Sequence, residues 1–134
     1  MDIISDAAGA PAPGFRDHPE HSIEITRHSG RVRATFGGAT IADTGSALVL
    51  LEAGYAPVFY VPLSDFSQAL LEPSAHTTYC PFKGTAGYYT IVVGDQRSEN
   101  ALWFYSEPYR EVGEIVGHAA LYTDRVETFE VTPG

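Results

Sequence analysis

The sequence predicts a single, mainly antiparallel β domain with two short helices. Apolar residues alternate with polar ones over short segments, beginning with Ile23 and Ile25, and a period of two is typical of half-buried strands. Turn signals separate these segments, as at Gly37 and Gly38, which favour a tight hairpin. With 134 residues and 44% apolar content, the chain is long enough for one core and too short for two domains.

Residues 1–20 are predicted to be a flexible N-terminal tail, followed by one domain over residues 21–134. The tail is rich in Ala, Gly, Pro and Asp and has no apolar period. The first half of the domain is expected to be mostly β. Its predicted strands cover residues 23–25, 32–36, 40–42, 47–51 and 58–61, with turns at 28–30, 37–38, 45 and 54–57.

The two helices are expected in the second half of the chain. Residues 64–71 favour one or two helical turns with Ser64 as the N-cap, and Pro73 is expected to end them. Pro108 favours the start of a second short helix, with Val112 and Ile115 on its apolar side. Residues 118–122 and 125–131 are then predicted to be closing strands.

The strongest strands, residues 87–93 and 97–105, are joined by a turn at Gly94 and Asp95. This turn makes Val93 pair with Gln96 in an antiparallel hairpin. If this pairing continues along the hairpin, Tyr88 lies opposite Ala101, and Trp103 lies diagonally beside Tyr88 on the same face. The two rings form either an aromatic platform that walls a pocket or part of an ordinary core.

The composition argues against nucleic acid and membranes as partners. The formal charge is −9, from 17 acidic and 8 basic residues, whereas phosphate backbones and anionic membranes require clustered cations. No apolar run approaches the roughly 18 residues of a spanning helix. The first residues lack the features of a secretory signal and the lone cysteine excludes an internal disulfide, so a cytoplasmic location is expected.

Residues 76–83 concentrate the chemistry of the chain, because they contain its only cysteine, its only lysine and one of its five histidines. Candidate catalytic residues are therefore His76, Cys80 and Lys83. Close to aromatic rings, the lysine could act as a general base, a Schiff-base nucleophile or a donor to an anion. The alternatives are an exposed lysine paired with an acidic neighbour and an inert, packed cysteine.

Geometry limits how these groups can combine. In a flat strand His76 and Cys80 share one face but lie about 13 Å apart, at roughly 3.3 Å per residue. Pro81 disfavours a helix at Cys80. A cysteine–histidine pair therefore needs either a curled loop or His118.

The aromatic and hydroxyl residues around this segment complete the candidate site. Tyr88 joins the catalytic candidates, and the predicted substrate-binding residues are Thr78, Tyr79, Trp103 and Tyr105. No metal or cofactor is expected, because the sequence has no paired CxxC, no glycine-rich phosphate loop and no GxSxG motif. His18 and His21 have metal-ligand spacing but no second ligand pair.

The chain contains the motif His76-x-Thr78-x-Cys80-Pro81-x-Lys83-Gly84-x-Ala86-x-Tyr88, followed by Trp103-x-Tyr105-x-x-Pro108. This motif resembles the bacterial domain of unknown function DUF427. The resemblance extends upstream to Ile41-Ala42-Asp43-Thr44, Tyr60-x-Pro62-x-x-Asp65 and Leu71-Glu72-Pro73, and downstream to Gly117-His118-x-Ala120-x-Tyr122. It covers about residues 23–127. Leu121 stands where the family often has an aromatic residue.

This resemblance implies an antiparallel β-tent-like fold, the architecture of methionine sulfoxide reductase B and of thalidomide-binding domains. Many β-tent proteins hold zinc on two cysteine pairs, which a chain with Cys80 alone cannot form. A nucleotidyltransferase label attached to the family would need an acidic metal-binding pair and a phosphate loop, and neither is recognisable here.

Together these observations predict a small-molecule enzyme or binding protein. Its pocket is expected between the two sheets, and its chemistry would be cofactor-free isomerisation, cyclisation or hydrolysis by acids and bases. The alternatives are a noncatalytic module that binds a metabolite or peptide, and a segment that serves the fold alone. The last predicts that Lys83 is solvent-exposed and far from any cavity.

Overall fold

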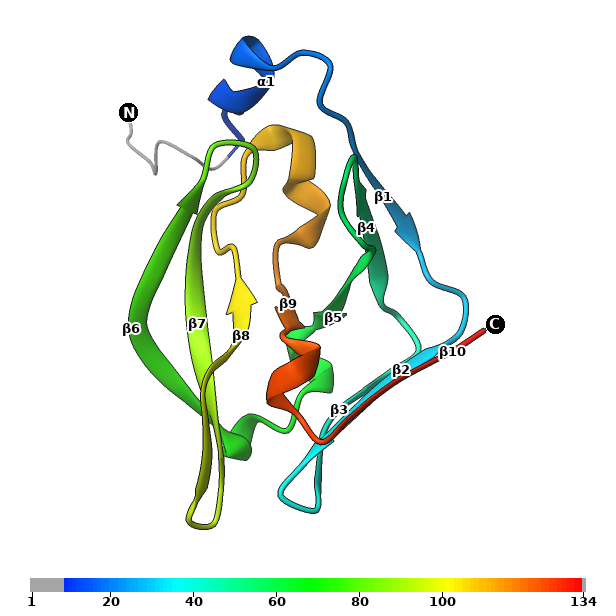
Figure 1. The fold of residues 1–134 in the computed structure, drawn as a ribbon, viewed down its shortest axis with the longest axis vertical. Coiled ribbons are helices and arrows are strands. Elements are labelled where there is room, and N and C mark those ends of the chain that lie inside the picture. Colours follow the sequence, from blue (N-terminus) through cyan, green and yellow to red (C-terminus); the bar gives the residue numbers. More distant parts are fainter. Residues whose placement is uncertain (1–8, 134) are drawn as a thin grey trace.

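The computed structural model describes residues 9–133 and confirms a mainly antiparallel β fold with short helices (Figure 1). A seven-stranded sheet has the order β1-β4-β5-β9-β8-β7-β6, and a three-stranded sheet has the order β10-β2-β3. All the strand pairs are antiparallel. The larger sheet is open, as in a tent-like β fold.

The seven-stranded sheet consists of two arms. The first contains β1 (Ile23–Arg27), β4 (Leu48–Glu52) and β5 (Val58–Pro62). The second contains β9 (His118–Leu121), β8 (Gln96–Phe104), β7 (Gly84–Val93) and β6 (Leu71–Cys80). Among residues 9–133, strand pairing joins the two arms at only two residue pairs, Val61 with Ala119 and Pro62 with His118. The arms diverge from this narrow junction (Figure 1).

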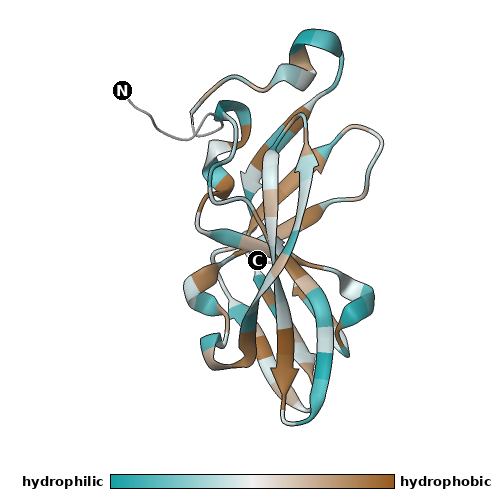
Figure 2. Cartoon of the chain, turned by 90° about the vertical axis from the view of Figure 1, so that its left-hand side faces the viewer, coloured by the Kyte–Doolittle hydropathy of each residue, from teal (hydrophilic) through white to brown (hydrophobic). Residues whose placement is uncertain are grey.

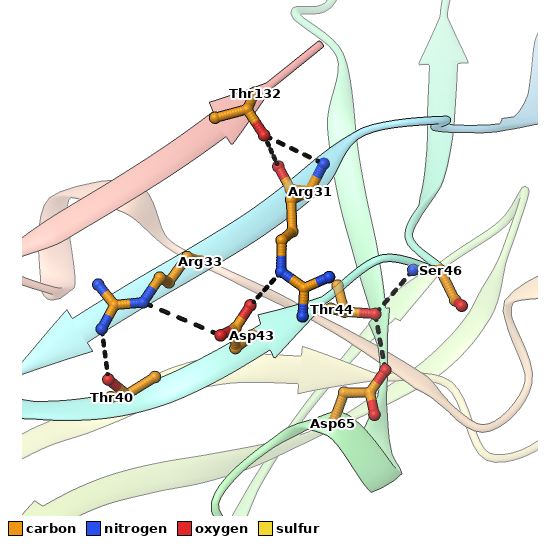
Figure 3. Close-up of polar contacts among 8 residues, drawn as sticks. All are labelled: Arg31, Arg33, Thr40, Asp43, Thr44, Ser46, Asp65 and Thr132. Atoms are coloured by element: carbon orange, nitrogen blue, oxygen red, sulfur yellow. Dashed lines mark hydrogen bonds and ion pairs between the residues drawn. The ribbon is translucent and has the colours of Figure 1, made fainter. Parts of the chain in front are cut away.

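The smaller sheet contains β2 (Arg31–Phe36), β3 (Ala39–Thr44) and β10 (Thr128–Thr132). Gly37 and Gly38 form the predicted hairpin turn between β2 and β3, each with a positive φ that suits glycine. On the outer side, Asp43 bridges Arg31 and Arg33 (Figure 3). Such exposed pairs contribute little to stability.

The main core lies between the two sheets. Val32, Ala34 and Ile41 of the small sheet pack there with Val61, Leu102 and Ala119 of the large one. The sequence neighbours of these three residues in the large sheet belong to a second cluster, on the opposite face of that sheet: Tyr60, Trp103 and Ala120. Neighbouring side chains of a strand point to opposite sides. Hydrophobic and hydrophilic residues are mixed along the strands (Figure 2).

The hairpin of β7 and β8 has the predicted turn, since Val93 pairs with Gln96. The predicted pairing of Tyr88 with Ala101 is wrong, because the register shifts between Tyr89 and Ile91 and places Trp103 directly opposite Tyr88. Asn100, with φ of 51°, lies in the irregular part of β8. The shift is two residues, which keeps both rings on one face, as expected.

The predicted helical regions are 3-10 helices. Residues 64–71 contain η1 (Leu63–Asp65) and η2 (Gln68–Leu70), and neither has a side-chain cap, so Ser64 is not the N-cap. The second region contains η3 (Arg110–Ile115), and a further turn, η4 (Thr123–Arg125), follows β9. Leu71 and Pro73 already belong to β6, an edge strand, where a proline is tolerated.

The described part of the predicted tail, residues 9–20, differs from that prediction because it packs on the domain. The helix α1 (Pro13–Asp17) places Gly14 against Phe82, and the Gly14 N–H donates to the Pro81 carbonyl at 2.9 Å. Phe15 makes an edge contact with the Phe82 ring. A segment without apolar period is held here by individual aromatic contacts and hydrogen bonds, which periodicity does not reveal. Residues 1–8 of the predicted tail lie outside the described residues.

Candidate functional site

Lys83 lies in the tight turn that links β6 to β7. Its N–H donates to the Cys80 carbonyl at 3.2 Å, and its own carbonyl accepts from the Tyr109 N–H at 3.0 Å. The following residue, Gly84, has φ of +118°, and a Cβ there would lie 3.3 Å from the Glu107 carbonyl oxygen. Glycine is therefore required for this turn, which fixes the direction of the lysine.

The Lys83 ammonium is buried in an ion pair with Glu52, the last residue of β4. Lys83 Nζ lies 2.7 Å from Glu52 Oε1, and the two side chains are only 13% and 12% exposed. Cys80 Sγ lies 4.0 Å from the same nitrogen. The structure thus contradicts an exposed lysine, while the predicted pairing with an acidic residue is present.

His21 holds the other side of the Glu52 carboxylate. Its Nε2 lies 2.7 Å from Glu52 Oε2, and its ring stacks on Phe82 with centroids 4.1 Å apart. Burial by itself would raise the pKa of Glu52, but the hydrogen bonds from Lys83 and His21 outweigh burial and lower that pKa below its ordinary value of 4.5. Glu52 is consequently a carboxylate at neutral pH.

A cavity of about 230 Å³ opens beside this ion pair on the face of the large sheet that carries Tyr60 and Trp103. Both arms contribute to its wall, which consists of Leu50, Glu52, Val58, Tyr60, Lys83, Tyr88, Trp103, Tyr105 and Tyr122. The predicted location between the two sheets is therefore wrong for this cavity. Its lining belongs to the second cluster, on the face of the large sheet opposite the main core.

The cavity wall is aromatic, with hydroxyl groups among the rings. Trp103 Nε1 donates to the Tyr60 hydroxyl at 3.2 Å, and Tyr88 shares a hydrogen bond with Thr78 at 2.9 Å. Burial raises the pKa values of Tyr60, Tyr105 and Tyr122. These phenols therefore remain protonated at neutral pH and can donate hydrogen bonds.

The structure brings together only part of the predicted site. Lys83, Tyr88, Trp103 and Tyr105 line the cavity, and Cys80 lies just behind the lysine. Thr78 supports Tyr88 from β6.

His76 and Tyr79 are not among the residues that line the cavity. Both belong to β6 rather than to a curled loop. The His76 ring packs on Tyr88 with centroids 4.6 Å apart, whereas the largely exposed Tyr79 pairs with Tyr109.

The sequence-based list lacked Glu52, His21 and Tyr60. The single lysine offered one indirect signal, since a buried ammonium requires a carboxylate partner, but nothing local selects Glu52 among 17 acidic residues. His21 was interpreted with His18 as a weak metal motif. Instead, His18 lies near the exposed Glu20 while His21 turns inward to Glu52.

Among residues 9–133, no three His, Cys, Asp or Glu side chains are grouped so that they could hold a metal ion. Within the same residues, no helix has the length and apolar character needed to cross a membrane.

Fold and site together define a tent-like β protein with a small aromatic cavity beside a buried lysine–glutamate pair. The chain belongs to the family described as domain of unknown function (DUF427), whose sequence model matches residues 24–132. This match includes the cavity-lining residues, but His21 and α1 precede it. A comparison with curated proteins finds no match.

Proposed function

We propose that the protein binds a small molecule in this cavity and transforms it by cofactor-free acid–base chemistry. The observation that carries the proposal is the buried Lys83 ammonium, which lines an otherwise largely aromatic cavity beside the Glu52 carboxylate. Ionised groups are rarely buried without function or strong pairing, and perturbed groups in a cavity are typical of functional sites. A structural ion pair is the competing explanation.

The pair offers a proton donor and a proton acceptor at one point. Lys83 can donate a hydrogen bond or a proton to a substrate oxygen, and Glu52, which is held as a carboxylate, can accept a proton from a nearby atom. An isomerisation or cyclisation needs only such a transfer within one molecule, so no oxidant or cofactor is required. Hydrolysis would require one water molecule as co-reactant.

The other residues have supporting roles in this proposal. Tyr88 donates to the substrate, while Trp103 and Tyr105 shape the apolar wall. Thr78 orients Tyr88, and His76 packs against its ring. The Cys80 thiol touches the lysine from outside the cavity lining, which suits a role in positioning the amine better than attack on a substrate.

The experiment is an untargeted conversion assay. Wild-type protein is incubated with a metabolite pool, and consumed and formed species are identified by mass spectrometry. Lys83→Met should abolish the conversion, whereas Arg97→Met, which removes an exposed cation of β8, should leave it unchanged. A ligand that only raises the thermal stability would indicate a noncatalytic binding module, and conversion that persists in Lys83→Met would exclude the central role of the lysine.

A further inference from the structure

The Tyr105 hydroxyl has no hydrogen-bond partner among residues 9–133, although Tyr105 is only 7% exposed and lines the cavity. Its neighbours include Tyr60, Cys80, Tyr88 and Glu52. A buried hydroxyl without a partner is destabilising, and most buried polar groups in proteins are paired. Because Tyr105 lies in the cavity wall, its hydroxyl can form this missing hydrogen bond with a ligand in the cavity.

Tyr60 supplies a second hydroxyl with unused capacity. It is 1% exposed, and its oxygen accepts from Trp103 Nε1, which leaves its own O–H without an acceptor in the described part of the chain. Tyr88 differs, because its hydroxyl already pairs with Thr78. The two unpaired hydroxyls therefore come from opposite arms, Tyr60 on β5 and Tyr105 just after β8.

The ammonium of Lys83 adds a third donor. It has three N–H groups, of which one points to Glu52 and another lies near the Cys80 sulfur. The Glu52 carboxylate, in contrast, already accepts from both Lys83 and His21. The wall thus presents an excess of donors, which is complementary to a ligand oxygen that accepts several hydrogen bonds.

We propose that the cavity binds a compound with one planar ring and a carbonyl oxygen, and that the Tyr60 and Tyr105 hydroxyls donate to this oxygen. The inference rests on the proposed function and specifies its ligand class. A cavity of about 150 Å³ is enough for benzene, so about 230 Å³ accommodates a ring with one polar substituent. The aromatic rings of the wall can pack against such a ring.

Benzamide is a suitable probe, because it combines a planar ring with a neutral carbonyl group. Its binding is measured by ligand-observed NMR at millimolar concentration. Tyr105→Phe and Tyr60→Phe should each weaken the binding about three- to tenfold, the effect of one lost hydrogen bond between uncharged groups. Tyr89→Phe is the matched control: Tyr89 packs against the other core cluster, so this variant should bind as wild type does. Toluene, which has the ring but no acceptor oxygen and no charge, should bind more weakly than benzamide, with equal affinity in wild type and Tyr105→Phe.

Stability without ligand gives an independent readout. Tyr105→Phe removes a buried hydroxyl that has no partner, so its unfolding equilibrium constant in urea should equal or fall below that of wild type. A marked rise would show that the hydroxyl has a structural partner and would overturn the proposal.

Two outcomes of the binding experiment would contradict the proposed carbonyl-binding site. One is an absence of benzamide binding to wild type, and the other is equal affinity in wild type and both phenylalanine variants. Neither affects the conversion assay, which depends on Lys83 and on the metabolite pool. Conversely, conversion that persists in Lys83→Met, together with benzamide binding that needs both hydroxyls, would reject the proposed acid–base role and retain the carbonyl site.

Discussion

Lys83 and Glu52 are separated by 31 positions in the sequence, yet their side chains form a 2.7 Å ion pair that connects the two arms of the large sheet. Glu52 ends β4 on one arm, and Lys83 occupies the turn between β6 and β7 on the other. In the described part of the chain, the arms otherwise pair as strands only between β5 and β9. The pair therefore contributes both to the cavity and to the relative position of its walls.

Replacing Glu52 with Gln should destabilise the protein by about 2–4 kcal/mol, because the Lys83 ammonium would remain buried without its counter-charge. The free energy of unfolding in urea measures this change. Glu72→Gln, which disrupts the exposed pair of Glu72 and Arg97, should cost less than about 1 kcal/mol.

The double variant Glu52→Gln with Lys83→Met should recover part of the stability lost in Glu52→Gln. Removing both partners leaves no uncompensated buried charge, and apolar replacements of such pairs are often well tolerated. Urea unfolding of wild type, the two single variants and the double variant gives the interaction free energy between the two side chains. Additive losses in the double variant would contradict a direct interaction between the two side chains.

The contribution of Glu52 should depend on pH. Its folded pKa lies below the ordinary value of 4.5, so the folded protein binds fewer protons at this carboxyl than the unfolded chain does. The stabilisation is therefore complete above about pH 4.5 and is lost as the pH falls through the folded pKa. The difference in unfolding free energy between wild type and Glu52→Gln should shrink over this acidic range. A constant difference would contradict the lowered pKa.

Gly14→Ala should destabilise the N-terminal packing by about 1–3 kcal/mol. An alanine Cβ at this position would lie 2.7 Å from two ring atoms of Phe82, the ring on which His21 stacks. Gly113→Ala is the matched control, because a Cβ there meets nothing within 4 Å and the backbone is not in the left-handed region. Thermal unfolding of both variants should separate them, and equal melting temperatures would contradict the packing of α1.

Asn100→Val should be more destabilising than Asn100→Gly. Asn100 has φ of 51°, where a β-branched residue is strained and glycine is not. Both variants lose the hydrogen bond from the Ser74 hydroxyl to the Asn100 side chain, so this loss cancels in their difference. The difference, about 1–2 kcal/mol in urea unfolding, reports the backbone strain of valine less the extra chain entropy that glycine loses on folding. Equal losses would show that the side-chain hydrogen bond dominates at this irregular position.

Short-range patterns in the sequence predicted most strands and the faces of their side chains. Alternation placed Tyr88 and Trp103 on one face, and this held despite a register shift of two residues. The strand β6 was missed, because Pro73 and the polar residues after it lack the apolar alternation of a buried strand. An edge strand with little burial leaves no such signal.

The sequence by itself determined the strand-rich fold, its main hairpin and the segment that carries Lys83, because side-chain direction and turn conformation depend on neighbouring residues. Only the tertiary structure decided that Glu52 and His21 meet at this lysine and that the cavity lies outside the main core. These features depend on strand order, register and the angle between the arms. Many weak contacts between distant residues set all three, and no local pattern encodes them.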